Sequence, residues 1–243
     1  MILIRKLLFI ITIPLVVFFI QEWLAIADDN WQLDDSAELS DAEEIELGKK
    51  VDEYILHQFY LRNDPELNKT LNEITQRLTA VSERKTLPFI CDIIQSYSIN
   101  AFSAPGGHIY VTEGLLKFAE TEDEVAGIIG HEVAHASLKH VSKLYREFME
   151  ILSQRDKGTD SAATLLLFTC HLEEFEQEAD TTGVLYAHKA GFNPNGLPDF
   201  LERHLNLLIR NGVFGFLRFD SYTTISSRIN HLKEYISTLE KEK

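Results

Sequence analysis

The sequence predicts a mainly helical α+β fold, and three observations support this class. Apolar residues recur at helical spacing both before and after the middle of the chain. The middle, from Leu87 to Gly114, is instead β-rich, and Gly and Pro divide it into shorter runs. Helices, a small sheet and further helices in this order are typical of one α+β domain, which we expect over residues 41–243.

The composition limits the classes of function. The chain has 243 residues, with 38 acidic and 23 basic side chains and a formal net charge of -15. This length suffices for one domain with a substantial core. A net charge of this sign argues against nucleic acid as a partner.

The N-terminus has the pattern of an export signal. Arg5 and Lys6 precede an apolar run from Leu7 to Ile20, and Ala25-Ile26-Ala27 supplies small residues after it. We interpret residues 1–27 as a signal peptide. The alternative is an uncleaved anchor, because the apolar run is only slightly shorter than a spanning helix requires. Either alternative places the remainder of the chain outside the cytoplasm.

Two cysteines, Cys91 and Cys170, accompany this predicted export. In an oxidising compartment they could form one disulfide, but two buried and independent thiols fit the sequence equally well. The sequence gives no distance between them, so both alternatives stay open.

Two helices are predicted after an acidic linker at residues 28–40. Ser40 begins the first helix, and Asp64 followed by Pro65 begins the second. Each carries an apolar stripe on one face. The stripes consist of Ile45, Val51, Ile55 and Phe59 in the first helix and of Leu67, Leu71, Ile74 and Leu78 in the second.

The β-rich middle predicts neighbouring strands. Two runs, Leu87–Phe102 and His108–Gly114, are joined by the Gly-rich connection Pro105-Gly106-Gly107. A short helix over Gly114–Ala119 follows, and a capping box at Thr121–Glu124 begins another helix. Later helical patterns run over residues 159–171, 173–190 and 195–210 and from 226 to the end.

The helix that begins at Thr121 carries candidate metal ligands. His131 and His135 are four residues apart, so both imidazoles project from one helix face and can bind one zinc ion. Glu132 lies beside them and can take a proton from a water molecule without binding the metal. The alternative is an ordinary packed helix that carries two histidines.

A catalytic zinc site requires a third protein ligand. In the segment "EEFEQEADTTG", Glu176 is a candidate ligand, and Asp180 lies one turn further along the same face. Asp180 could accept the ring N–H of His131 and fix its tautomer. The alternative for this segment is a solvated acidic face.

Four segments together carry a family resemblance. They are "NAFSAPGGHIYVTEGLL", "EVAGIIGHEVAH", "EQEAD" and "AGFNPNG". The chain resembles the HtpX-like and CAAX-prenyl-protease-like zinc metallopeptidases, which are gluzincins. Within them it is most similar to the bacterial periplasmic BepA and LoiP type and to the Oma type. The likeness extends from about Asp41 to the C-terminal helix.

The resemblance implies the roles of the site residues. One zinc ion per chain would be bound by His131, His135 and Glu176, with Glu132 as general base and Asp180 behind the ligands. The implied fold is a gluzincin domain with an active-site helix and a small sheet whose edge strand lies beside the cleft.

The edge strand and the C-terminal region hold further candidates. Protein substrates bound in extended form would pair with the strand at Asn100, Ala101 and Phe102. Tyr222 stands where periplasmic relatives often carry a histidine, and Arg228 belongs to an Arg-Ile pair typical of them. Both are candidate contacts to substrate or transition state.

The other histidines are expected to be surface or packing residues. Two of them, His108 and His231, lie on segments that the family fold brings near the cleft. His57, His140, His171, His188 and His204 complete the set.

Two functions remain in competition. The first is an exported zinc metalloendopeptidase, periplasmic in location, that cleaves unfolded or misassembled envelope proteins. It implies association with the membrane or with envelope assembly machinery. The second is a chaperone-like protein that binds clients and keeps its metal site largely closed. A metal-dependent hydrolase of small molecules is a weaker alternative, because it has no use for a strand that pairs with peptide backbone.

Overall fold

The computed structural model describes residues 39–144, 146, 161–211 and 221–241, and for residues 54, 161–173 and 221–224 it describes the backbone alone. The predicted signal peptide and residues 28–38 of the predicted linker lie outside the described residues. The elements in chain order are α2 (Asp41–Gln58), α3 (Pro65–Thr79), β1 (Ile90–Ile94), β2 (Ala101–Ser103), η2 (Pro105–Gly107), β3 (His108–Thr112), α4 (Glu113–Phe118), α5 (Glu122–Ser137), α7 (Ser161–Lys189), α8 (Gly196–Arg210) and α9 (Ser221–Leu239).

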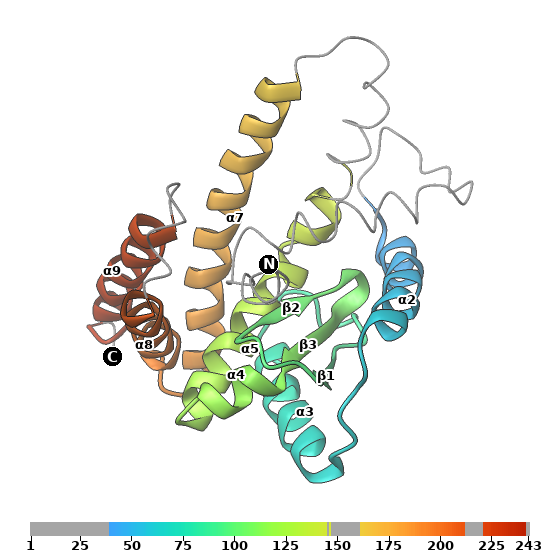
Figure 1. The fold of residues 1–243 in the computed structure, drawn as a ribbon, viewed down its shortest axis with the longest axis horizontal. Helices are drawn as coiled ribbons and strands as arrows, with labels where there is room; N and C mark the ends of the chain where they lie inside the picture. Colours follow the sequence, from blue (N-terminus) through green and yellow to red (C-terminus); the bar gives the residue numbers. More distant parts are fainter. Residues whose placement is uncertain (1–38, 145, 147–160, 212–220, 242–243) are drawn as a thin grey trace.

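The arrangement of these elements confirms the predicted α+β class. A small sheet lies between α2 on one side and α5 on the other, and α7, α8 and α9 lie beyond α5 (Figure 1). α5 therefore occupies the middle of the molecule. It packs against α3, β2, α7 and α8.

Both N-terminal helices begin where the sequence predicts. Ser40 accepts a hydrogen bond from the Glu43 backbone N–H at 3.3 Å, and the Glu43 carboxylate accepts one from the Ser40 N–H at 2.8 Å. This reciprocal pair satisfies two donors that the first turn would leave unpaired. In α3, Asp64 accepts from the Leu67 N–H at 3.2 Å and Pro65 occupies the first turn.

The sheet has the strand order β1-β3-β2, with β1 parallel and β2 antiparallel to β3. The prediction of one continuous run over Leu87–Phe102 is wrong, because this segment contains two strands. Ser96 and Ser98 separate them, and their hydroxyls form a local hydrogen bond of 2.9 Å. Serine hydroxyls that bond locally compete with strand ladders. The predicted Gly-rich connection is confirmed as η2, which joins β2 to β3.

Thr121 begins α5, but the predicted capping box is incomplete. The Thr121 hydroxyl accepts from the Glu124 N–H at 3.2 Å. The Glu124 carboxylate does not return to Thr121. It accepts from the Glu120 N–H at 2.7 Å and pairs with Arg203 of α8 at 2.8 Å. A charge-assisted pair with Arg is stronger than a neutral cap, so the tertiary contact determines where this carboxylate lies.

The C-terminal half is simpler than predicted. One continuous helix, α7, replaces the two helices expected over residues 159–171 and 173–190. No Gly or Pro stands between those two patterns, so nothing in the backbone ends the helix there. α8 and α9 follow the predicted patterns, although α9 begins five residues earlier than expected, at Ser221 rather than 226.

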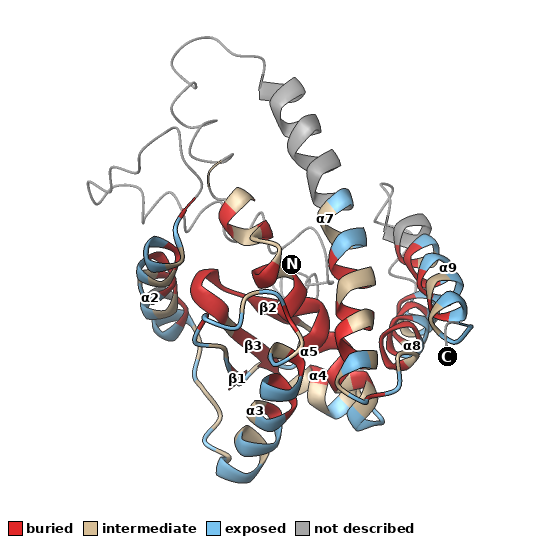
Figure 2. Ribbon diagram, turned by 180° about the vertical axis from the view of Figure 1, so that it is seen from behind, coloured by how far each residue is buried: buried red, intermediate tan, exposed pale blue. Residues whose placement is uncertain are grey.

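The core lies along α5 and β3, which are buried over most of their lengths (Figure 2). Close approach of α5 to α7 depends on two glycines. A Cβ at Gly183 would lie 2.6 Å from the His131 backbone nitrogen, and one at Gly130 would lie 2.9 Å from the Gly183 carbonyl oxygen. Both distances are shorter than van der Waals contact, so the two helix backbones touch directly beside the histidines.

Two further expectations concern the membrane and the cysteines. Within the described part of the chain, no helix combines the length and apolar character that a bilayer crossing requires. Cys91 carries a free thiol buried in the sheet, and burial raises its pKa. The side chain of Cys170 lies outside the described side chains.

Candidate metal centre

α5 presents two histidines on the face that it turns toward α7. His131 and His135 are one helical turn apart, and their Nε2 atoms lie 3.0 Å from each other. Their side chains are 7% and 12% exposed. The Thr121 cap determines where α5 begins, and the contact between Gly130 and Gly183 determines how closely α7 approaches it. Local structure thus places both rings at the interface of two helices.

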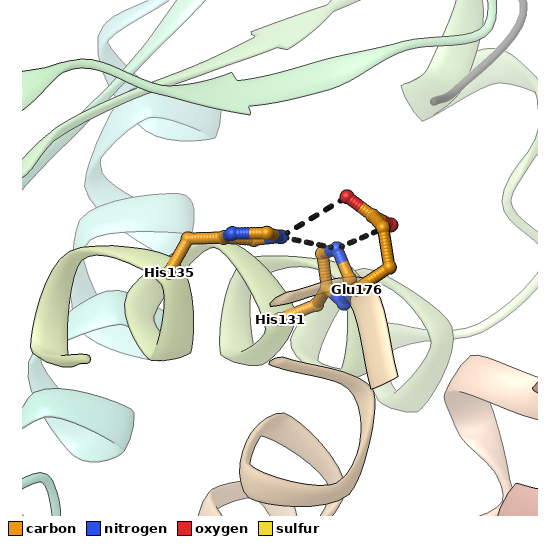
Figure 3. Close-up of side chains that lie close together, drawn as sticks. All are labelled: His131, His135 and Glu176. Atoms are coloured by element: carbon orange, nitrogen blue, oxygen red, sulfur yellow. Dashed lines mark hydrogen bonds and ion pairs between the residues drawn. The ribbon is translucent and has the colours of Figure 1, made fainter. Parts of the chain in front are cut away.

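Glu176 of α7 reaches the same point. Its carboxylate oxygens lie 3.5 Å from His131 Nε2 and 3.4 Å from His135 Nε2 (Figure 3). Figure 3 shows the two rings and the carboxylate converging from two helices. Among the described residues, these three form the group of histidine, cysteine and acidic side chains able to hold a metal ion. The structure therefore brings the three predicted ligands together.

The spacing of the three ligand atoms fits a zinc ion. Tetrahedral zinc, with bonds of about 2.0 to 2.2 Å, separates its ligand atoms by about 3.3 to 3.6 Å. The two separations that involve Glu176 are 3.4 and 3.5 Å and lie within this range, and the separation between the two histidine nitrogens is slightly shorter, at 3.0 Å. Two imidazole nitrogens and one carboxylate are also a donor set that catalytic zinc sites use, with a fourth position left for water.

Behind this group lies a buried ion cluster of Asp180 and Arg228. Asp180 Oδ1 lies 2.9 Å from His131 Nδ1, on the side of the ring opposite to the ligand atom. Arg228 of α9 donates from Nε to Asp180 Oδ2 at 2.6 Å and from Nη2 to Oδ1 at 2.7 Å. Its Nη1 lies 3.0 Å from Glu176 Oε2. Arg228 therefore contacts both Glu176, the third proposed ligand, and Asp180, the residue that lies behind His131.

The charges of this cluster favour a cation. Burial alone would raise the pKa of Glu176, but Arg228 and the two histidines lower it well below its usual range. The pKa of Asp180 is also lowered, because Arg228 and His131 outweigh burial. Burial would lower the pKa of His131, yet Asp180 and Glu176 raise it. Two carboxylates against one guanidinium leave excess negative charge, and deprotonated carboxylates are the form that binds metal.

Glu132 follows His131 on α5 and is only 8% exposed. Its carboxylate makes no hydrogen bond or ion pair with any described side chain. A carboxylate without such a partner, one residue from a ligand, keeps its oxygens available to accept a proton.

His140 is a neighbour of the site that the sequence reasoning missed. It is fully buried, its Nδ1 lies 3.2 Å from His135 Nδ1, and its Nε2 lies 3.0 Å from Glu178 Oε2. Burial lowers its pKa to about 2, with a smaller effect of the nearby His135. In the sequence, His140 is the fifth residue after His135. An uninterrupted helix would turn a residue at that position away from the site.

The remaining candidates lie elsewhere. Ala101 and Phe102 are buried in β2, the edge strand that packs against α5, and Asn100 directly precedes it. The side chain of Tyr222 lies outside the described side chains. His231 is exposed and lies 3.2 Å from the Thr181 hydroxyl, one residue after Asp180 in the chain.

His108 is not brought to the ligand group. Its ring lies between two carboxylates, with Nδ1 2.9 Å from Asp52 of α2 and Nε2 2.9 Å from Asp92 of β1. This places the side chain between α2 and the sheet, and the expectation that it lies near the cleft is not supported by any contact with the three ligands.

Comparisons with known proteins found a family and several relatives. The model of peptidase family M48 matches residues 65–236. A putative beta-barrel assembly-enhancing protease of Vibrio cholerae is 30% identical over 165 residues, which are 58% of this chain and 33% of that protein. The beta-barrel assembly-enhancing protease of Escherichia coli (strain K12) is 25% identical over 191 residues, 69% of this chain and 39% of that protein.

A eukaryotic relative is similar over a shorter part of the chain. The mitochondrial metalloendopeptidase OMA1 of Schizosaccharomyces pombe is 27% identical over 146 residues, 55% of this chain and 42% of that protein. The chain thus spans well under half the length of these curated relatives. The family match nevertheless covers more than half of the chain itself and includes every proposed ligand. The chain therefore belongs to peptidase family M48, the zinc metallopeptidases that its motifs resemble.

Proposed function

We propose that the chain is a zinc metalloendopeptidase that hydrolyses peptide bonds in proteins. One observation carries the proposal: two histidines and a glutamate converge beside Glu132, whose carboxylate makes no hydrogen bond or ion pair with a described side chain. Membership of family M48 and the names of the relatives, which are proteases and metalloendopeptidases, support it.

Each residue has a distinct role in the proposed reaction. His131, His135 and Glu176 would hold one zinc ion, which would supply polarisation of the scissile carbonyl and acidification of a water molecule. The Glu132 carboxylate accepts the proton of that water and then donates it to the leaving amine nitrogen. Asp180 keeps the His131 proton on Nδ1, so that Nε2 presents its lone pair to the ion.

The substrate class follows from the edge strand. β2 pairs with β3 on one side only, and no further described strand covers its other side. An extended substrate segment could add to this edge at Asn100 to Phe102 through backbone hydrogen bonds. Such bonds recognise the peptide backbone more than particular side chains. We propose unfolded or misassembled envelope proteins as substrates. The names of the bacterial relatives, which refer to beta-barrel assembly, support this proposal, and the pattern of residues 1–27 supports export.

The test compares two variants of the full mature chain. Glu132→Gln should keep one zinc per chain but lose at least about a hundredfold in cleavage of casein, because the proton acceptor is gone. Glu176→Gln should lose zinc as well as cleavage. Zinc content by mass spectrometry and casein hydrolysis are the measurements. Full activity of Glu132→Gln would refute the mechanism, and tight zinc binding by Glu176→Gln would refute the third ligand.

A second candidate function is a client-binding protein whose metal site stays largely closed. The low exposure of all three ligand side chains, between 7% and 18%, favours it. The Glu132→Gln variant separates the two functions in cells that lack the wild-type gene. Full complementation by this variant would favour binding, whereas loss of complementation together with loss of casein cleavage would favour proteolysis.

A further inference from the structure

Family M48 and the proposed ligand set leave one buried group beside the site unexplained. His140 has no exposed surface, and it makes no hydrogen bond with the Glu132 carboxylate or with the three proposed ligand atoms. Its Nδ1 atom lies 3.2 Å from Nδ1 of His135, which is on the side of the His135 ring opposite to the ligand nitrogen. A buried imidazole in this place needs a hydrogen-bonding role.

The bonding pattern of the two rings has one consistent solution. A neutral imidazole carries one N–H donor and one acceptor nitrogen. If His135 offers Nε2 to a metal, its proton lies on Nδ1, and His140 Nδ1 must accept that proton's hydrogen bond. His140 then carries its own proton on Nε2, and Glu178 Oε2 lies 3.0 Å away to accept it. Each of the two hydrogen bonds, from His135 to His140 and from His140 to Glu178, then joins one donor to one acceptor.

The backbone between the rings is bent to make this contact. α5 ends at Ser137, Leu138 caps it, and Lys139 adopts a φ of 60° before helical residues resume at His140. A positive φ at a residue other than Gly costs free energy and persists where surrounding structure requires it. The bend brings His140 back toward a ring five residues earlier, which a straight helix would not do.

α7 supplies the other half of the support. Phe175 stacks on the His140 ring, with centroids 4.3 Å apart and planes 12° apart. Phe175 and Glu178 flank the proposed ligand Glu176 on the same helix. One helix therefore provides the third ligand, the aromatic surface behind His140 and the carboxylate that orients it.

We propose that His140 is a positioning residue for the zinc ligand His135, and that Glu178 in turn fixes the tautomer of His140. The inference rests on the proposed zinc site. His140 would support the second ligand, His135, in the way that Asp180 supports the first ligand, His131. Hydrogen bonds of this kind to metal-bound histidines hold the ring orientation and raise ligand basicity, and their loss typically weakens metal binding by about ten- to a hundredfold.

The test uses a matched pair of substitutions at one position. His140→Phe keeps an aromatic ring on Phe175 but removes the acceptor, so zinc affinity should fall by roughly ten- to a hundredfold. His140→Asn places an oxygen where Nδ1 was and should restore the affinity to within about threefold of wild type, because the acceptor returns. Competition with a chromophoric chelator measures affinity on the full mature chain. The visible spectrum of the cobalt(II) form should shift for His140→Phe and return for His140→Asn.

A second pair of substitutions tests the contact between His140 and Glu178. Glu178→Ala should weaken zinc binding by about three- to tenfold, less than His140→Phe, because the 60% exposed carboxylate can be partly replaced by water. Glu174→Ala, an exposed acid one turn earlier on α7, is the control and should leave the affinity unchanged.

The outcomes separate this inference from the proposed function. Thermal unfolding of the zinc-free proteins shows whether a variant merely destabilises the fold. A zinc affinity of His140→Phe equal to that of the wild type would overturn the positioning role of His140. A His140→Asn variant that binds zinc as weakly as His140→Phe would also overturn it. Either result would leave the peptidase proposal intact. A wild-type protein that binds no zinc would overturn both.

Discussion

At the scale of single residues, Arg228 is the group whose removal has the clearest consequence. It is 4% exposed and pairs with Asp180 and Glu176 together. Removing one partner of a buried ion pair costs about 3 to 5 kcal/mol, because the remaining charges are left uncompensated. Here two carboxylates would remain, and one of them is the proposed third ligand.

We therefore expect Arg228→Met to be strongly destabilised without zinc and partly rescued by it. A bound cation compensates Glu176 in place of the guanidinium, so zinc should raise the free energy of unfolding of the variant by more than it raises that of the wild type. Urea unfolding with zinc and with chelator measures both gains.

Arg203→Met is the matched control for this prediction. Arg203 also pairs with carboxylates, Glu120 and Glu124, but it contacts none of the proposed ligands. Its substitution should cost the same with and without zinc. An Arg228→Met variant that behaves like this control would show that Arg228 does not share Glu176 with the ion.

Spacing within a helix accounts for what could be predicted of the site. His131, Glu132 and His135 follow from a four-residue repeat, because residues one turn apart share a face. Glu176 and Asp180 needed the family resemblance in addition, since sequence alone does not tell which distant helix packs against α5. His140 was missed because the φ of 60° at Lys139 breaks the helical repeat, and no local pattern predicts that bend.

At the scale of elements, the distance between α5 and α7 determines the geometry of the site. His131 and His135 lie on one helix and Glu176 on the other, so separations of 3.4 and 3.5 Å depend on how closely the backbones approach. Gly183 is the residue that permits this approach, because a Cβ there would meet three backbone atoms of α5 within 2.8 Å.

Gly183→Ala should therefore push the two helices apart. We expect a loss of about 1 to 3 kcal/mol in the free energy of unfolding, typical of overpacking, and a fall in zinc affinity because the carboxylate recedes from the imidazoles. Thr182→Ala, on the adjacent position of α7, is the control and should change neither quantity strongly. Unfolding in urea and chelator competition are the measurements, and unchanged zinc affinity in Gly183→Ala would contradict the role given to this contact.

Helix beginnings were more predictable than strand boundaries. Ser40 and Asp64 cap their helices as expected, because capping depends on residues within one turn. The boundary between β1 and β2 was missed, since serines that turn the chain differ little in pattern from serines within a strand. The order β1-β3-β2 was not predictable either, because parallel pairing of β1 with β3 joins residues far apart in the chain.

At the scale of the whole molecule, an ion network joins the N-terminal helix to the sheet. His108 of β3 lies between Asp52 of α2 and Asp92 of β1, and the Tyr110 hydroxyl donates to Asp52 at 2.9 Å. α2 also packs on η2, where the Gly106 N–H donates to Glu44 at 3.3 Å. The network is one of several polar connections of α2; another is Arg84, which pairs with Glu44 at 2.9 Å and with Asp41.

This network makes the stability of the whole domain depend on pH. Burial would lower the pKa of His108, but hydrogen bonds to Asp52 and Asp92 outweigh it and raise the pKa to about 9, above the value near 6.5 of an unfolded chain. The folded protein thus holds a proton that the unfolded chain releases between these values. The stabilisation is complete below pH 6.5 and is lost as pH rises through 9, by up to about 3 kcal/mol.

We expect the difference in unfolding free energy between wild type and His108→Gln to shrink between pH 6.5 and pH 9 in urea titrations. His57→Gln, which removes an exposed imidazole from α2, should follow the wild type. A difference between wild type and His108→Gln that stays constant from pH 6 to pH 10 would show that His108 is not the proton-linked contact between α2 and the sheet.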